Sequence, residues 1–340
     1  MHMKTILVTG GMGYIGSHTV VELINKNYNV IIVDNLFNSN IEVLNRINKI
    51  TGITPKFYEL DCCNYSDFKK VFMENKIDGA IHFAGYKAVG EGEAFPLKYY
   101  DNNLTSFINL LKLMEEFKVN NLVFSSSATV YGQPDTNPIK EDFPFRVANT
   151  YGRTKLMIED IIRDYSKANK TFNSAILRYF NPIGAHPSGL IGEDPNGIPN
   201  NLAPYICKVM VGKLDKLGIF GNDYDTPDGT GVRDYIHVVD LAYGHVLVLD
   251  KLFSNSGLVT YNLGTGKGNS VFDVLHAFEK ACGFKIPYEI KPRRAGDVAI
   301  YYASPEKAYK ELGFKTRYDI FDMAKDAWCW QKNNPNGYKK

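Results

Sequence analysis

The sequence predicts an α/β fold in which a doubly wound parallel sheet is followed by a smaller, loop-rich C-terminal lobe. In the first half of the chain, short apolar runs alternate with helical patterns, as expected for a parallel sheet covered by helices on both faces. A glycine-rich turn joins the first apolar run to the first helical pattern. After about Asn181 the pattern changes, because residues 182–234 are rich in Pro, Gly, Asn and Asp and show little periodicity. Such loops are typical of a substrate-binding lobe built on a rigid scaffold.

The apolar runs predict the strands of this sheet at residues 5–9, 28–33, 57–60, 79–83, 121–125 and 174–178. The helical patterns predict helices at residues 17–25, 66–74, 101–117 and 154–168.

Composition and charge exclude several classes of protein. The 340 residues are 44% apolar and 22% charged with a net charge of +2, so no strong field favours nucleic acid or an anionic membrane. No apolar run is long enough to span a membrane, and no signal peptide precedes the first strand. The five cysteines are scattered and form no metal-binding pattern. We therefore expect reduced thiols, no metal and a cytoplasmic protein.

A phosphate-binding turn is predicted between Thr9 and Gly16, in the run TGGMGYIG. Gly10, Gly13 and Gly16 allow a tight turn and let the N-terminus of the next helix approach a pyrophosphate. Asp34 ends the second predicted strand, where a carboxylate accepts hydrogen bonds from both ribose hydroxyls and repels a 2′-phosphate. The sequence therefore predicts a Rossmann-type fold that binds NAD rather than NADP. A glycine turn without a ligand is the alternative.

Two further strand ends supply candidate cofactor contacts. Asp61 follows the third predicted strand, where it suits the adenine amino group or caps the helix that begins near Ser66. The run from Phe83 through Ala84 and Gly85 follows the fourth strand, where small residues let a dinucleotide lie across the strand ends. Lys87 is within reach of the cofactor ribose or phosphate.

A tyrosine–lysine pair, Tyr151 and Lys155, is the most informative feature of the chain. Residues four apart share one helix face, so the phenol and the ammonium point into the same space. A cation about 4 Å away at an effective dielectric near 20 contributes about 4 kcal/mol, or about three pKa units, which brings a phenol close to neutrality. An oxidised nicotinamide ring acts in the same direction. With the serine run Ser125 to Ser127 before it, the pair predicts an acid/base beside NAD.

These motifs resemble the UDP-glucose 4-epimerases, a family within the extended short-chain dehydrogenase/reductase superfamily. The resemblance extends from Thr5 to about Trp330. The glycine motif and the Tyr-x-x-x-Lys pattern mark only the superfamily, whereas FAGYKAVGE, SSSATVYG and NPIGAHPSG are more specific to the family.

The resemblance implies roles for individual residues. Tyr151 would be the acid/base on the sugar 4-hydroxyl, Lys155 would bind the nicotinamide ribose, and Ser127 would hydrogen-bond the same hydroxyl. Together with the motifs above, it implies that NAD is bound by Gly10, Gly13, Tyr14, Ile15, Gly16, Asp34, Asn35, Asn38, Ser39, Asp61, Cys62, Phe83, Ala84, Gly85, Lys87, Asn102, Tyr151, Lys155 and Phe180. The family commonly has an aliphatic residue at the position of Cys62, where only the backbone is expected to act.

The resemblance also implies a UDP-hexose substrate. Its expected contacts are Lys87, Ser127, Tyr151, Asn181, Asn201, Leu202, Leu217, Phe220, Arg233, Tyr235, Arg294, Asp297 and Tyr301. The planar guanidinium groups of Arg233 and Arg294 suit a diphosphate, although an isolated arginine is more often a solvated surface residue. A bulky Tyr301 would crowd an N-acetyl group at C2, so UDP-N-acetylhexosamines are expected to be poor substrates.

The implied reaction interconverts UDP-glucose and UDP-galactose through a transient 4-keto sugar, with hydride passing to and from tightly bound NAD and Tyr151 moving the proton. We expect residues 1–181 to form the NAD-binding domain. Residues 182–340 are expected mainly to bind the UDP-sugar, with part of about 235–265 returning to the first domain.

Several other activities stay open. A nucleotide-sugar 4,6-dehydratase places an acidic pair directly after the catalytic Ser or Thr, whereas Ala128 and Thr129 follow Ser127 here. Another epimerase, acting on UDP-uronates or UDP-N-acetylhexosamines, and a dehydrogenase with freely exchanging NAD are weaker alternatives. A non-catalytic NAD-sensing protein is an alternative of a different class.

The helices expected at residues 101–117 and 154–168 carry many apolar residues at helical spacing. Such residues usually belong to the core. The resemblance implies that these two helices pair across a dimer interface, so a homodimer is expected.

Overall fold

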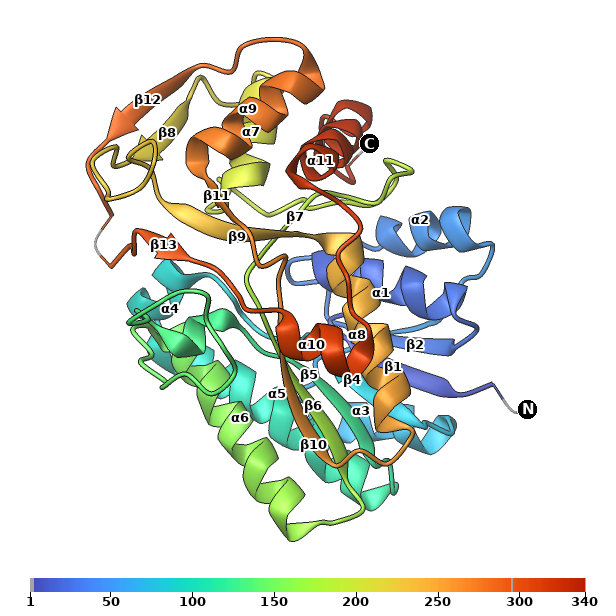
Figure 1. Ribbon diagram of the computed structural model, residues 1–340. Helices are drawn as coiled ribbons and strands as arrows, with labels where there is room; N and C mark the ends of the chain where they lie inside the picture. The colour runs from blue at the N-terminus through green and yellow to red at the C-terminus, as the bar shows by residue number, and fades with distance from the viewer. Residues whose placement is uncertain (1–2, 295, 340) are drawn as a thin grey trace. The chain divides into compact units, whose positions relative to one another are not determined.

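The computed structural model describes residues 3–294 and 296–339 (Figure 1). The predicted domains begin at residue 1 and end at residue 340, and these two residues lie outside the described range. The chain divides into two compact units. The first contains the residues up to Gly132 together with Phe145–Arg178 and Ala242–Tyr261. The second contains Gln133–Pro144, Tyr179–Leu241 and the residues from Asn262 onward.

The first unit is built on a seven-stranded sheet with the strand order β10-β6-β5-β4-β1-β2-β3. The strands are β1 (Thr5–Thr9), β2 (Asn29–Asp34), β3 (Lys56–Glu59), β4 (Gly79–His82), β5 (Asn121–Ser125), β6 (Asn173–Tyr179) and β10 (Leu258–Leu263). From β3 to β6 every neighbouring pair runs parallel. The order reverses between β1 and β4, which is the switch point where open α/β sheets bind ligands. The predicted α/β fold is confirmed.

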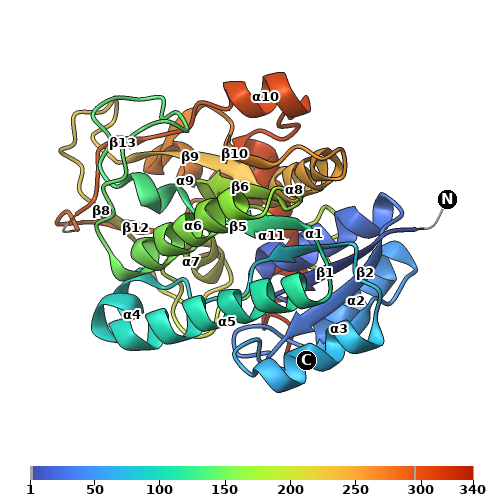
Figure 2. The same cartoon turned by 90° about the horizontal axis from the view of Figure 1, so that it is seen from below.

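Helices cover both faces of this sheet (Figure 2). They are α1 (Tyr14–Asn25), α2 (Glu42–Thr51), α3 (Tyr65–Glu74), α4 (Val89–Ala94), α5 (Pro96–Glu116), α6 (Thr150–Ala168) and α8 (Val238–Leu252), with a 3-10 turn η1 (Ala128–Tyr131). Apolar side chains of α3, α5 and α6 share one buried cluster with residues of β1, β2, β4, β5 and β6. On the other face α1 packs against α2, and Lys26 after α1 lies 5.8 Å from the ring centre of Tyr243 in α8.

The structure extends several predicted helices at their N-termini. Apolar periodicity in the fourth predicted helix begins at Thr154, but α6 begins at Thr150 because the Asn149 side chain accepts a hydrogen bond from Gly152 N at 2.8 Å. The helix α5 begins at Pro96, a residue that is well tolerated in the first turn. The sequence patterns did not predict α2 and α4.

The second unit contains two small sheets and four helices among its described residues. A four-stranded sheet has β9 (Val232–His237) at its centre, paired with β11 (Gly268–Ser270), β13 (Ile300–Tyr301) and β7 (Asn181–Ile183). A two-stranded sheet joins β8 (Leu217–Phe220) to β12 (Tyr288–Lys291). The helices are α7 (Leu202–Met210), α9 (Val271–Cys282), α10 (Glu306–Leu312) and α11 (Ile320–Asn333). The loop-rich prediction for residues 182–234 missed β7, α7, β8 and the start of β9.

The core of the second unit lies between α7, α9 and α11 and one side of β8. Capping boxes fix the N-termini of α9 and α11, where Ser270 pairs with Asp273 and Asp319 with Asp322. Within the described part of the chain, we find no helix with the length and apolar character needed to cross a membrane. All five cysteines are free thiols.

Candidate active site

Predicted site residues of the first unit follow the C-terminal ends of five neighbouring strands. The glycine turn follows β1, Asp34 ends β2, Asp61 follows β3, Phe83 follows β4, and the serine run ends β5. Parallel strands bring these ends to one edge of the sheet, on both sides of the switch point between β1 and β4. The first unit therefore gathers the predicted NAD contacts, except Phe180, which belongs to the second unit.

The glycine turn is packed too closely for larger residues. Gly10 has a φ of +70°, and a Cβ atom there would lie 2.7 Å from Ala84 N, so the turn touches the loop after β4. A Cβ at Gly16 would lie 2.2 Å from Gly10 O, so the helix α1 can only approach the turn with glycine there. Gly13 is the N-cap of α1, and no side chain caps this helix end. A helix N-terminus without a side-chain cap suits a bound anion.

Asp34 organises the loop that follows β2. Its Oδ2 accepts a hydrogen bond from Met12 N at 3.0 Å, and its Oδ1 accepts from Leu36 N at 2.9 Å and Ser39 Oγ at 2.8 Å. Burial raises the pKa of the Asp34 carboxyl, and these hydrogen bonds act in the opposite direction. The predicted ribose contact is therefore tied directly to the glycine turn through Met12.

Asp61 does not cap the helix that follows it. The N-cap of α3 is Asn64, whose side chain accepts from Asp67 N, so the helix-cap alternative for Asp61 is wrong. The Asp61 carboxylate instead accepts from Cys63 N at 2.8 Å and from Asn35 Nδ2 at 3.3 Å. It thereby links the loops after β2 and β3, both of which carry predicted NAD contacts.

The loop after β4 is held by a residue that the sequence analysis did not single out. Asn103 Oδ1 accepts from Tyr86 N at 2.8 Å, and its Nδ2 donates to Tyr86 O at 3.1 Å and to Thr154 Oγ1 at 3.0 Å. Gly85, with a φ of +151°, would place a Cβ only 3.1 Å from Asn103 Oδ1. Asn102 donates to the same oxygen at 3.0 Å. Asn103 thus fixes the backbone of this loop relative to α6.

Tyr151 and Lys155 lie on the first two turns of α6, as the spacing predicted. Lys155 is buried, its Nζ donates to Ser125 O at 2.8 Å, and it lies 5.8 Å from the centre of the Tyr151 ring. Burial lowers the pKa of Lys155 to about 8, while the charge of Glu159 acts in the opposite direction. Ser127, also buried, is the N-cap of η1 and accepts from Thr129 N at 3.2 Å and Thr129 Oγ1 at 2.9 Å.

A buried ionic network continues behind the predicted catalytic group. Glu159, one turn beyond Lys155, accepts from Ser126 Oγ at 2.7 Å and from Arg178 Nε and Nη2 at 2.9 and 2.6 Å. Arg178 also donates to Tyr131 OH at 2.8 Å. The sequence analysis missed this network, although the four-residue spacing from Tyr151 through Lys155 to Glu159 continues one helix face.

His82 is a further buried residue that sequence reasoning missed. It ends β4, and its Nδ1 is 2.8 Å from Thr9 Oγ1 at the end of β1. Burial, followed by the charge of Lys155, lowers the pKa of His82 to about 3. A neutral imidazole therefore joins the two strands of the switch point.

In the second unit, β9 brings predicted substrate contacts together. Arg233 lies opposite Tyr301 in the β9–β13 pair, and Tyr235 lies opposite Asn181 in the β9–β7 pair. Tyr301 also contacts Phe180, with ring centres 5.3 Å apart. Four predicted contacts are therefore neighbours on three paired strands.

Each of the two arginines that are predicted to bind substrate in this unit contacts a neighbouring side chain. Arg233 Nη2 lies 3.9 Å from Asp297 Oδ1, and the Arg294 guanidinium stacks over the Phe220 ring at 3.8 Å from its centre. Stacking leaves the edge of a guanidinium free to donate. Such an edge suits a diphosphate or a nucleotide base.

Other predicted substrate residues differ in their exposure. Leu217 and Tyr235 are buried, and Leu217 packs in the core of the second unit. Asn201 is the N-cap of α7, which begins at Leu202, and its Nδ2 donates to Glu193 Oε1 at 3.2 Å. The roles of all these residues stay predictions.

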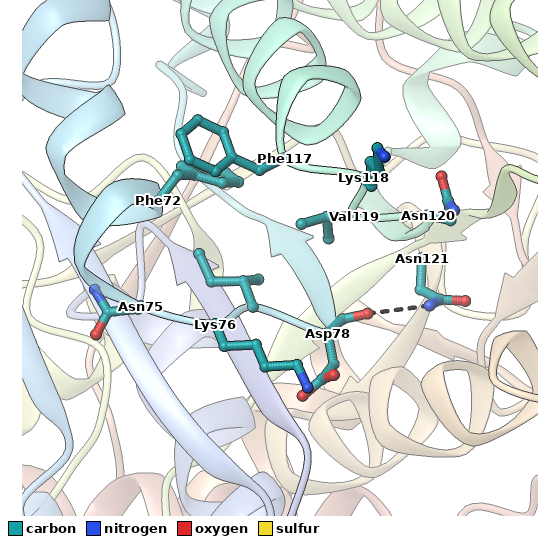
Figure 3. Close-up of a pocket in the computed structure, with 10 residues that line it drawn as sticks. Phe72, Asn75, Lys76, Asp78, Phe117, Lys118, Val119, Asn120 and Asn121 are labelled. Carbon is teal, nitrogen blue, oxygen red and sulfur yellow. Dashed lines mark hydrogen bonds between the residues drawn. The ribbon is translucent and has the colours of Figure 1, made fainter.

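A cavity of about 480 Å³ in the first unit lies at the wrong edge of the sheet for this site (Figure 3). Asp78, just before β4, and Asn121, the first residue of β5, line it, and Asn121 Nδ2 donates to Asp78 O at 3.0 Å. These are N-terminal strand ends, whereas open α/β sheets bind ligands at the carboxyl ends. The cavity is therefore separate from the candidate site.

The residues at the carboxyl edge fit a bound dinucleotide. The uncapped N-terminus of α1 offers N–H donors to a pyrophosphate, and Asp34 offers a carboxylate to ribose hydroxyls. For metals, residues 3–294 and 296–339 contain no group of three or more His, Cys, Asp or Glu side chains able to hold an ion.

Comparison with known proteins gives consistent results. The model of the NAD dependent epimerase/dehydratase family matches residues 6–264. The UDP-glucose 4-epimerase of Bacillus subtilis (strain 168) is 57% identical over 334 residues, which cover 98% of each chain. The UDP-glucose 4-epimerase of Dictyostelium discoideum is 55% identical and covers 98% of this chain and 97% of its own.

Among solved structures, UDP-glucose 4-epimerase from Bifidobacterium longum in complex with NAD⁺ and UDP superposes with a TM-score of 0.95 at 55% identity. The match covers 98% of this chain and 100% of that one. This similarity and the family match lead to one conclusion: the chain belongs to the NAD dependent epimerase/dehydratase family.

Proposed function

We propose that this protein interconverts UDP-glucose and UDP-galactose with a tightly held NAD. The observation that carries the proposal is the pair formed by Tyr151 and Lys155 on α6, with the Lys155 ammonium fixed to the carbonyl of Ser125, two residues before Ser127. The similarity to UDP-glucose 4-epimerases over 98% of the chain supports the substrate. The domain roles follow: the first unit binds NAD and the second mainly binds the UDP-sugar.

The residues of the first unit would perform the proton chemistry. When bound, NAD would supply the acceptor for the hydride of C4 of the sugar and the donor for its return. Tyr151, as a phenolate, takes the proton of the 4-hydroxyl and gives it back to the same oxygen when hydride returns to the opposite face of C4. The Lys155 ammonium stabilises the phenolate, and Ser127 hydrogen-bonds the sugar oxygen.

The second unit would hold the nucleotide while the sugar changes faces. Arg233 and Arg294 are planar donors for the diphosphate. Both are already oriented within the unit, because Arg233 donates to Val232 O at 3.0 Å and Arg294 is stacked on Phe220. Strong binding of the diphosphate, with few charged contacts to the hexose, allows the 4-keto sugar to rotate and present its opposite face.

Replacing Tyr151 tests this proposal directly. Tyr151→Phe should lower kcat about 10²- to 10⁴-fold, because the proton acceptor is lost. Its NAD content should match that of the wild type, because the glycine turn and Asp34 are unchanged. Tyr309→Phe is the matched control, since Tyr309 is 48% exposed on α10. A Tyr151→Phe variant with a wild-type rate would refute the proposal.

We also propose a homodimer that forms through the helices at about 101–117 and 154–168, in a cytoplasmic protein. The helices α5 and α6 pack side by side (Figure 2). Apolar side chains stay partly exposed on both, including Leu104 and Ile108 on α5 and Met157 and Ile161 on α6. These residues repeat at four-residue spacing and support a shared stripe. The five free thiols support a reducing compartment.

A further inference from the structure

We propose that Phe37, Tyr86 and Lys98 form an aromatic clasp that retains NAD in its site. The inference rests on the proposed function. It assigns a role to three residues that the motifs leave unexplained, and it concerns how slowly the cofactor leaves rather than how the sugar reacts.

The clasp joins two loops across the glycine turn. Phe37 follows β2 and Tyr86 follows β4, whereas β1 and its glycine turn lie between these two strands. Neighbouring strands are about 4.8 Å apart, so β2 and β4 are separated by about 10 Å. The two rings nevertheless meet, with centres 5.1 Å apart and planes tilted by 59°. The contact therefore spans the turn where we place the pyrophosphate.

A cation completes the clasp. Lys98 Nζ, on α5, lies 5.2 Å from the centre of the Phe37 ring and 4.7 Å from that of Tyr86. Glu91 holds the ammonium at 2.7 Å. A single ammonium thus attracts both rings and favours their contact.

The two sides of the clasp are anchored differently. Tyr86 is fixed by both backbone hydrogen bonds to Asn103 and by contact with the buried Tyr99 ring at 5.6 Å. Phe37 is 55% exposed and follows Leu36, a residue with a φ of +55°. The side chain of Phe37 is therefore the part that moves when the clasp opens.

The arrangement has a kinetic consequence. A dinucleotide lying on the glycine turn must pass between the loops after β2 and β4 to leave, so the rings must first separate. Each interaction that stabilises the contact between the two rings lowers the fraction of time in which the exit path of the dinucleotide is open. Loss of either ring should accelerate release by the same factor, because the contact needs both.

The test is exchange of bound NAD for deuterium-labelled NAD supplied in excess to the holoenzyme, followed by mass spectrometry of the retained cofactor. Phe37→Ala and Tyr86→Ala should each exchange about tenfold faster than the wild type. The double variant should be no faster than the faster single variant, because one contact is lost only once. Tyr86→Phe keeps the ring and should exchange at the wild-type rate.

Phe284→Ala is the matched control, since Phe284 is 45% exposed and contacts Trp328 in the second unit. It should exchange at the wild-type rate. Wild-type exchange rates in both Phe37→Ala and Tyr86→Ala would overturn the clasp while leaving the proposed function intact. A double variant whose exchange rate is raised by the product of the two single factors would do the same. A wild-type protein that binds no NAD would overturn the proposed function and the clasp with it.

Discussion

At the scale of single residues, Lys155 is the group whose environment bears most directly on the reaction. The sequence predicted its place beside Tyr151 and its effect on the phenol. It could not predict that the side chain is buried or that its ammonium is anchored by Ser125 O, because both depend on strand β5, which comes earlier in the chain. Burial also makes Lys155 itself titratable near neutral pH.

The pH dependence of kcat should report this titration. Burial lowers the pKa of Lys155 to about 8, so the ammonium is present below that pH and is lost above it. Loss of the cation removes the stabilisation of the Tyr151 phenolate, and kcat should fall on the alkaline side with an apparent pKa of about 8. Initial rates over a pH series measure it.

Lys155→Arg provides the control for this assignment. An arginine stays protonated throughout the accessible range, so the alkaline fall should disappear even if the maximal rate is lower. An unchanged alkaline fall in Lys155→Arg would assign the titration to another group.

At the scale of elements, α6 links the reaction to the stability of the first unit. One face carries Tyr151 and Lys155 and then Glu159, whose carboxylate is fully buried against Arg178. Sequence periodicity predicts such a face. It did not reveal the partners of Glu159, because Ser126 directly follows β5 and Arg178 lies on β6, and both meet α6 only in the folded sheet.

Glu159→Gln should lower the stability of the protein strongly. It leaves the Arg178 charge buried without a counter-ion, a change that costs about 3–5 kcal/mol. The midpoint of thermal unfolding should fall by about 4–7 °C. Asp160→Asn is the control, because Asp160 pairs with Arg163 at the surface and is 61% exposed, so its midpoint should stay within about 2 °C. Equal midpoints for the two variants would contradict the role of the network.

The second unit shows most clearly which features could not be predicted from the sequence. The central strand β9 contains Asp234, a fully buried carboxylate that interrupts an apolar pattern. The structure accounts for it, because Asp234 accepts from Thr265 N, Gly266 N and Ala303 N at 2.8, 3.0 and 3.1 Å. Its partners are distant in the sequence, so neither the strand nor the pairing of Arg233 with Tyr301 follows from local pattern.

At the scale of the whole molecule, the proposed dimer is testable by mass. Light scattering at micromolar concentration should give twice the 38.3 kDa mass of the chain. Met157→Glu places a charge on the proposed stripe and should shift the mass toward the monomer. Met73→Glu is the matched control, since Met73 is a 68% exposed methionine on α3, and it should stay dimeric. A monomeric wild type would exclude the dimer.

The central claim is that the protein performs an epimerisation in which NAD is used and regenerated within each turnover. The most direct measurement is to incubate the purified holoenzyme with UDP-galactose, without added cofactor, and to separate the nucleotide sugars. The account predicts that UDP-glucose forms over many turnovers with no net reduction of NAD. Failure to convert UDP-galactose, even with NAD supplied, would contradict it.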